Sequence, residues 1–142
     1  MLTAALARTR GEENALMQEQ RAAAMIGYLR GVVLAPPAQL ERGHAIFVDD
    51  RGGWLGDAAC GIGTMTSLSL SLRALLGEAL RLDAAGIILA HSHPSGHCRP
   101  SGCDIAASRR LSEVARALDI ALVDHLIFTT EAVYSMRAGG LL

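Results

Sequence analysis

The sequence predicts an α/β fold in which a mixed central sheet is flanked by helices. About half of the 142 residues are apolar (51%), which suits a buried sheet covered by helices. The apolar run at residues 85–90 is typical of a buried strand, and the amphipathic segment at 105–118 is typical of a helix. A polar loop connects the two, so strand, loop and helix follow one another as in α/β proteins.

Residues 1–37 are predicted to form a helical N-terminal prelude. Residues 1–14 have weak periodicity, so we expect a loose arm or a short helix there. Residues 16–33 contain strong helix formers and one partial apolar stripe. Pro36 and Pro37 end this helix, because proline disfavours the helical conformation in the residue before it.

Residues 38–142 are long enough for one domain core and too short for two. Residues 44–48 and 54–60 are predicted strands, and the Asp and Gly residues at 49–53 suit the turn of a hairpin. A helix capped by Ser71 should run to about Asp83, with its apolar side chains on one face. The later predicted elements are a strand at 86–90, a helix at 102–118 and strands at 120–129 and 132–136.

Composition excludes some classes of function. The formal net charge of −1 argues against an extended basic groove for nucleic acid, which would need clustered cations. No apolar run approaches the roughly 18 residues that span a membrane. The N-terminus lacks a basic region followed by an apolar core, and the three cysteines are an odd set that suits reduced thiols. We therefore expect a cytoplasmic protein with no membrane contact.

The segment from His91 to Asp104 carries the strongest functional signal. His91 and His93 are two residues apart on an extended segment, so their imidazoles point to the same side. Asp104 would lie in the first turn of the following helix and could aim its carboxylate back at them. Two imidazoles and a carboxylate form a three-ligand zinc site with a fourth position open. Two structural alternatives remain: a hydrogen-bonded strand-end histidine, and a helix N-cap at Ser101 completed by Asp104.

Two further groups suggest alternative sites. Cys98 and Cys103, with nearby histidines such as His97, could form a closed structural zinc site, although their spacing is loose and the loop is short. Asp124 and His125 could act as a pair in which the acid orients a catalytic imidazole. Adjacent strand residues face opposite sides of a sheet, which favours a structural role for this second pair.

The string HSHPSGHCRPSGCD resembles the RadC branch of the JAMM zinc metallopeptidases. The shared pattern is His-x-His, seven residues, Ser, two residues and Asp. The similarity extends to residues 82–90 and 123–128, and more weakly to 45–49 and the C-terminus, which together cover roughly 100 residues.

This resemblance implies the JAMM/MPN architecture, which is cytidine-deaminase-like, and a Zn²⁺ ion held by His91, His93 and Asp104. It implies that Ser101 donates a hydrogen bond to the oxyanion. The implied reaction is hydrolysis of a peptide or isopeptide bond.

One position departs from the family pattern, which places a catalytic Glu five residues before a Gly-Thr pair. Counting back from Gly63 and Thr64 gives Ala58, and the nearest acid, Asp57, is one residue off. A one-residue shift in a strand turns the side chain to the opposite face, so Asp57 is a candidate base only if a β-bulge re-aims it. Without the general base a metal would bind while hydrolysis is slow or absent.

Two hypotheses follow. The first is a zinc-dependent hydrolase of the metallopeptidase type with impaired activity, acting on a peptide or protein. The second is a catalytically inactive scaffold that binds a metal or a protein partner. The residues predict neither the substrate, the oligomeric state nor the pathway, and they give no support to a role in DNA repair.

Overall fold

The computed structural model describes residues 2–37, 40–62 and 71–142, and it places them in two units, Met1–Gly31 and Val32–Leu142. Helix α1 (Leu2–Val33) is continuous, so the expectation of a loose arm or short helix at residues 1–14 is wrong. Ala, Leu, Arg and Glu are strong helix formers, and they outweigh the single Gly11 in this stretch. The predicted domain boundary after Pro37 stays a prediction.

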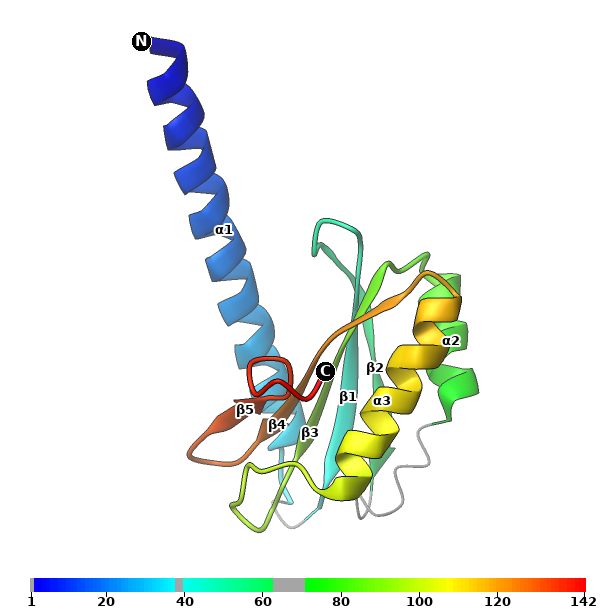
Figure 1. Ribbon diagram of the computed structural model, residues 1–142. Coiled ribbons are helices and arrows are strands. Elements are labelled where there is room, and N and C mark those ends of the chain that lie inside the picture. Colours follow the sequence, from blue (N-terminus) through cyan, green and yellow to red (C-terminus); the bar gives the residue numbers. More distant parts are fainter. Residues whose placement is uncertain (1, 38–39, 63–70) are drawn as a thin grey trace. The chain divides into compact units, whose positions relative to one another are not determined.

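The second unit contains a mixed five-stranded sheet with the order β2-β1-β3-β4-β5, which confirms the predicted fold class (Figure 1). Strand β1 pairs antiparallel with both β2 and β3, β3 pairs parallel with β4, and β4 pairs antiparallel with β5. The strands are β1 (Arg42–Val48), β2 (Trp54–Ile62), β3 (Gly86–Ser92), β4 (Ala121–Phe128) and β5 (Val133–Ser135).

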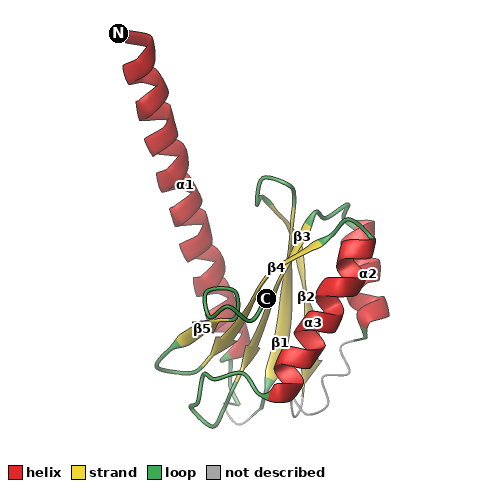
Figure 2. Ribbon diagram, in the orientation of Figure 1, coloured by secondary structure: helices red, strands yellow, loops and turns green. Residues whose placement is uncertain are grey.

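Helices α2 (Leu72–Arg81) and α3 (Gly102–Ala117) cover one face of this sheet (Figure 2). Both contribute to one buried cluster with the sheet residues that face them, so the core lies between the helices and the sheet. Among the cluster members are Ala45 and Phe47 of β1, Ile87 and Leu89 of β3, Leu122 of β4, Leu75 and Ala79 of α2, and Leu111 and Ala115 of α3.

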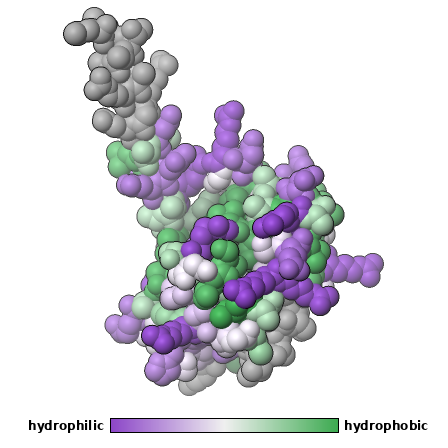
Figure 3. All heavy atoms as spheres, viewed as in Figure 1, coloured by the Kyte–Doolittle hydropathy of each residue, from purple (hydrophilic) through white to green (hydrophobic). Residues whose placement is uncertain are grey.

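The helices present a narrower apolar stripe to the core than their sequences indicate. Leu80, Val114 and Leu118 have the helical spacing of the apolar face, but they are 55%, 38% and 42% exposed. Each helix packs on a sheet on one side only, so side chains at the margin of the stripe stay in solvent. The exposed side chains of α3 include the charged residues Arg109, Arg110, Glu113 and Arg116. Figure 3 shows hydrophilic side chains scattered over the visible surface.

Strand β3 leads directly into the segment singled out by the sequence. It is buried between β1 and β4, and its carboxyl end continues into a turn in which the Gly96 N–H donates to the His93 carbonyl at 3.1 Å. Gly96 has φ of +84°, a conformation that glycine adopts without strain. The His93 N–H donates to the Phe128 carbonyl at 2.9 Å, so pairing with β4 continues past the end of β3. The loop then returns to the start of α3.

Within the residues that the structure describes, no helix is both long enough and apolar enough to cross a membrane.

Candidate metal centre

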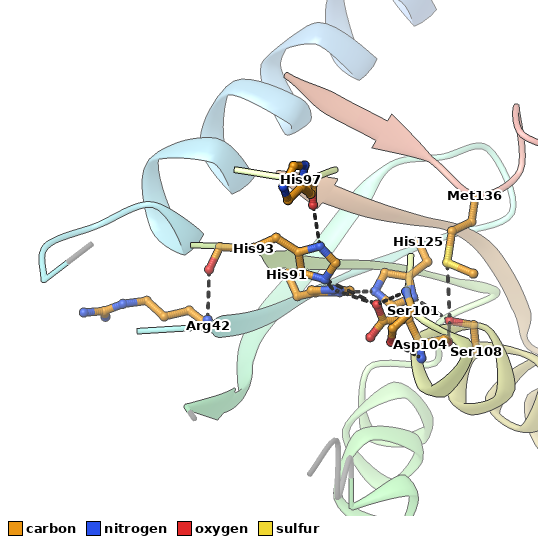
Figure 4. Close-up of polar contacts among 10 residues, drawn as sticks. Arg42, His91, His93, His97, Ser101, Asp104, Ser108, His125 and Met136 are labelled. Atoms are coloured by element: carbon orange, nitrogen blue, oxygen red, sulfur yellow. Dashed lines mark hydrogen bonds and ion pairs between the residues drawn. The ribbon is translucent and has the colours of Figure 1, made fainter. Parts of the chain in front are cut away.

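Three side chains meet where β3 ends and α3 begins (Figure 4). The possible ligand atoms of His91, His93 and Asp104 all lie within 4.8 Å of one another. The Nε2 atoms of His91 and His93 are 2.8 Å apart. The Oδ2 atom of Asp104 lies 3.3 Å from Nε2 of His93 and 3.7 Å from Nε2 of His91. The structure therefore brings together the three residues that the spacing selected.

The capping box predicted as an alternative is also present. The Ser101 Oγ atom accepts from the Asp104 N–H at 3.1 Å, and Asp104 Oδ2 accepts from the Ser101 N–H at 2.7 Å. The cap and the cluster thus share one carboxylate. Asp104 is fully buried, and its other oxygen, Oδ1, has no hydrogen-bond partner among the described residues. A buried carboxylate oxygen without a partner is costly, and a bound cation would satisfy it.

The three groups shift one another's protonation. Burial raises the pKa of Asp104, but His91, His93 and the Ser101 N–H together outweigh burial and hold that pKa well below its usual range. Burial lowers the pKa of His91, and the neighbouring Asp104 carboxylate offsets part of this. The hydrogen bond with Asp104 raises the pKa of His93, which is less buried. A carboxylate that stays ionised beside an imidazole that stays neutral suits a metal site.

Each histidine of the cluster has a partner for its second ring nitrogen. The Nδ1 atom of His93 lies 2.8 Å from the His97 carbonyl oxygen, which can only accept, so Nδ1 carries the proton. The Nδ1 atom of His91 lies 2.5 Å from Nε2 of His125, a fully buried residue of β4. The Nδ1 atom of His125 is in turn 2.5 Å from the Ser108 hydroxyl, which also lies 2.8 Å from the Asp104 carbonyl oxygen.

The sequence predicted neither the role of Ser108 nor the contact between His125 and His91. The contact was missed because a β-bulge changes the phase of β4. Ile87 pairs with Leu122 and Leu89 pairs with His125, so three residues of β4 match two of β3. Leu122 and His125 consequently face the same side, which simple alternation forbids. Burial lowers the pKa of His125 to about 3, so the imidazole is neutral at pH 7. The only signal in the sequence for this contact was His125 itself, a polar residue within an apolar strand.

Asp124 and His125 do not act as a pair, in agreement with the prediction that they face opposite ways. The Asp124 carboxylate accepts from the Ser135 hydroxyl at 2.5 Å and from the Arg137 N–H at 3.1 Å, whereas the imidazole of His125 turns to His91. The acid therefore holds the end of the chain against β4.

Asp57 is not brought to the cluster. Its Oδ2 atom lies 2.6 Å from Nε2 of His44. Asp57 pairs with Ile46, whereas Ala58 pairs with Ala45, whose side chain lies in the core beneath the helices. Asp57 thus faces the opposite side of the sheet, as the strand phase predicted.

No bulge re-aims Asp57. The register shifts of this hairpin lie between Gly43 and His44 and between Phe47 and Val48, on either side of it. Ala58, at the position of the family's Glu, packs against the core on the same face as His91. The Gly63-Thr64 pair used for the count lies outside the described residues.

The cysteines are not in the cluster. Within the described ranges, the group able to hold a metal contains His91, His93 and Asp104 and no thiol. Cys103 is exposed, and the Sγ atom of Cys98 lies 3.4 Å from the Thr129 hydroxyl. Burial raises the pKa of the third cysteine, Cys60, to about 12, so its thiol stays protonated. The closed Cys/His site therefore has no support from the geometry.

A mixed sheet covered by helices, with a His-x-His pair after a buried strand and an acid opening the next helix, is the arrangement of a JAB-type domain, and the three side chains form a cluster that could hold a metal ion. The chain belongs to the RadC-like JAB domain family, whose sequence model matches residues 18–141.

The chain is similar to several UPF0758 proteins. A UPF0758 protein of Bordetella avium is 40% identical over 103 residues, and one of Acidithiobacillus ferrooxidans is 38% identical over 95. These matches cover 72% and 67% of this chain but only 46% and 42% of the relatives. A UPF0758 protein of Paraburkholderia phytofirmans is 34% identical over 82% of this chain and 44% of its own length. The chain thus spans less than half the length of the curated relatives it matches.

Proposed function

We propose that this domain binds a zinc ion through His91, His93 and Asp104, and that it is a metallopeptidase-type hydrolase of impaired activity. The observation that carries the metal site is the buried carboxylate of Asp104. Its Oδ1 atom has no hydrogen-bond partner in the described part of the chain, and its Oδ2 atom lies 3.3 Å from Nε2 of His93 and 3.7 Å from Nε2 of His91. Two imidazoles and one carboxylate are a donor set that zinc prefers in catalytic sites.

The residues around this centre suit attack on a carbonyl group. A zinc ion held there would supply a Lewis acid that polarises a peptide carbonyl. Ser101 accepts from the Asp104 N–H, which leaves its own hydroxyl proton to donate to a developing oxyanion. The substrate class, a peptide or protein, comes from the family resemblance, and Ser101 keeps the role assigned to it there.

The missing proton acceptor explains why we propose impaired activity. Ala58 occupies the position of the general base, and Asp57 faces the opposite side of the sheet. General bases typically contribute about 10²- to 10⁴-fold to a rate, so a metal site without one turns over slowly. This same observation favours a second candidate function, an inactive scaffold that binds metal or a protein partner.

The test is the zinc content of the purified protein beside a His91→Ala/His93→Ala variant, with His44→Ala as the matched control. We expect about one zinc ion per wild-type and control chain, and none in the double variant. Zinc retained by the double variant would transfer the site to Cys98 and Cys103. No zinc in any of the three, even with excess metal, would exclude the hydrolase and leave the metal-free scaffold.

Two other parts of the proposal concern the whole chain. We place the start of the metal-binding domain after Pro37 and treat residues 1–37 as its helical prelude. The three cysteines are free, which suits a reducing compartment, and we propose a cytoplasmic location on that ground.

A further inference from the structure

We propose that Ser108 and His125 are positioning residues that hold His91 in the one tautomer able to bind a metal through Nε2. The inference rests on the proposed metal site and assigns it a buried support. The support is a chain of side chains that runs from His91 through His125 to Ser108 and ends on the backbone of Asp104, so it joins two of the three ligands (Figure 4).

The direction of every proton in this chain follows from its first member. A metal needs the lone pair of His91 Nε2, which requires the proton to lie on Nδ1. That Nδ1–H donates to His125 Nε2 at 2.5 Å, so the proton of a neutral His125 must lie on its Nδ1 atom. The His125 Nδ1–H donates to Ser108 Oγ at 2.5 Å, and the Ser108 hydroxyl donates to the Asp104 carbonyl at 2.8 Å.

With a metal ion on Nε2 of His91, every donor in the chain has an acceptor. The chain ends on the Asp104 carbonyl, which never donates, so the Ser108 hydroxyl donates to it. If either His125 or Ser108 were reversed, a donor or acceptor would lose its partner. The residues concerned are at most 1% exposed, so water has little access to replace that partner.

The two histidine ligands differ in how they are held. His93 donates to a main-chain carbonyl, that of His97, which no side-chain substitution removes. His91 depends entirely on the imidazole of His125. Outer hydrogen-bond partners of metal-ligating histidines typically change metal affinity by about 10- to 100-fold when they are removed. Substitution of His125 should therefore act on one ligand and leave the other in place.

The experiment compares zinc affinities, measured by competition with a chromophoric chelator, for wild type and for His125→Leu, His125→Gln and Ser108→Ala. Leucine fills the space without an acceptor, whereas the glutamine side-chain oxygen can occupy the place of Nε2 and accept from His91. We expect about 10- to 100-fold weaker binding for leucine, wild-type affinity within about threefold for glutamine, and an intermediate loss for Ser108→Ala. His44→Leu, a buried histidine outside the chain of hydrogen bonds, is the matched control and should bind zinc normally.

A second measurement separates positioning from packing and needs no metal. Side-chain ¹⁵N NMR of the metal-free wild type should show His91 protonated at Nδ1 and not at Nε2, and the glutamine variant should keep this tautomer. The leucine variant should show a mixture, because nothing selects Nδ1. If the His125→Leu variant does not fold, the zinc affinities and tautomers of the His125→Gln and Ser108→Ala variants are compared with those of wild type instead.

The results distinguish this inference from the proposed function. Unchanged zinc affinity in the leucine variant would overturn the inference, as would equal losses in the leucine and glutamine variants, which indicate packing alone. A wild-type His91 protonated at Nε2 would also overturn it. If wild type binds no zinc, the proposed function fails, and the NMR tautomers alone then decide whether His125 selects the protonation of His91.

Discussion

Two pairings of histidine with aspartate lie on opposite faces of the same sheet, and they differ in how many imidazoles converge on the carboxylate and in how deeply that carboxylate is buried. His44 and Asp57 meet at 2.6 Å, a distance at which the imidazole and the carboxylate bond directly to each other. At the second site the carboxylate of Asp104 lies 3.3 Å from His93, a second imidazole adjoins it, and one buried oxygen has no partner in the described residues. A set of metal ligands is therefore recognised by several lone pairs that converge on one point, which a single hydrogen bond between a histidine and an aspartate does not provide.

The surroundings of the two acids explain the difference. Asp57 lies on edge strand β2, where its side chain is 28% exposed and solvent can complete its hydrogen bonds. Asp104 opens α3 beneath the sheet and is fully buried. A buried charge is tolerated only with nearly complete pairing, so Asp104 depends on its neighbours far more than Asp57 does.

The first prediction concerns the two acids. Asp104→Asn removes the ligand charge, and we expect zinc affinity to fall by at least about 100-fold. Asp57→Asn makes the same chemical change on the other face and should leave affinity within about twofold. Chelator competition measures both. Equal affinities for the two variants would mean that Asp104 is only a helix cap.

The next prediction concerns the missing base on β2. Ala58→Glu places a carboxylate on the face that carries His91, and we expect zinc-dependent peptidase activity about 10²- to 10⁴-fold above wild type. A fluorogenic peptide assay with and without chelator measures it. Ala58→Gln is the matched control and should stay at the wild-type rate. A robustly active wild type that Asp57→Ala inactivates would contradict the proposal, because Asp57 would then be the base.

Periodicity predicted the elements that build the site. The apolar run before His91 became β3, and the amphipathic segment after Asp104 became α3, because both signals are local. The strand phase also placed Asp57 away from the cluster. The His-x-His spacing and the acid at the helix start brought three groups together because the chain reverses only once between them.

The support of the cluster could not be predicted in the same way. The contact between His91 and His125 joins residues 34 positions apart, and it depends on a bulge in β4 that simple alternation does not reveal. Ser108 carries no signal at all, because a serine inside a helix is ordinarily a neutral surface residue. The local spacing of the motif thus predicted the candidate ligands. The long-range register of the sheet, which positions the partner of His91, could not be predicted from it.

The pH dependence of stability tests the buried chain of hydrogen bonds that supports His91. His125 is neutral in both the folded and the unfolded protein above its unfolded pKa of about 6.5. Below that pH the unfolded chain binds a proton, which the folded protein resists until about pH 3 because burial lowers the pKa of His125. We therefore expect the free energy of unfolding of the metal-free protein to fall by up to about 1.4 kcal/mol for each pH unit as the pH is lowered from about 6.5 to about 3.

Urea denaturation of the metal-free protein at several pH values measures this slope. His125→Gln does not titrate and should have a shallower slope, while the lowered pKa of His91 adds a slope of the same sign. The raised pKa of His93 acts in the opposite direction, because its stabilisation is lost as pH rises. Identical slopes in wild type and His125→Gln would show that His125 is not the titrating group.

The smallest predicted effect separates the cap from the cluster. Ser71 and Ser101 both cap helices, and each hydroxyl accepts a backbone N–H at 3.1 Å. Replacement of either by alanine should lower the free energy of unfolding by about 1 kcal/mol, measured by denaturation of the metal-free protein. Ser101→Ala should leave zinc affinity within about threefold, because the Ser101 backbone N–H still holds the Asp104 carboxylate at 2.7 Å. A large loss of zinc with Ser101→Ala, absent in Ser71→Ala, would instead make the hydroxyl part of the metal site.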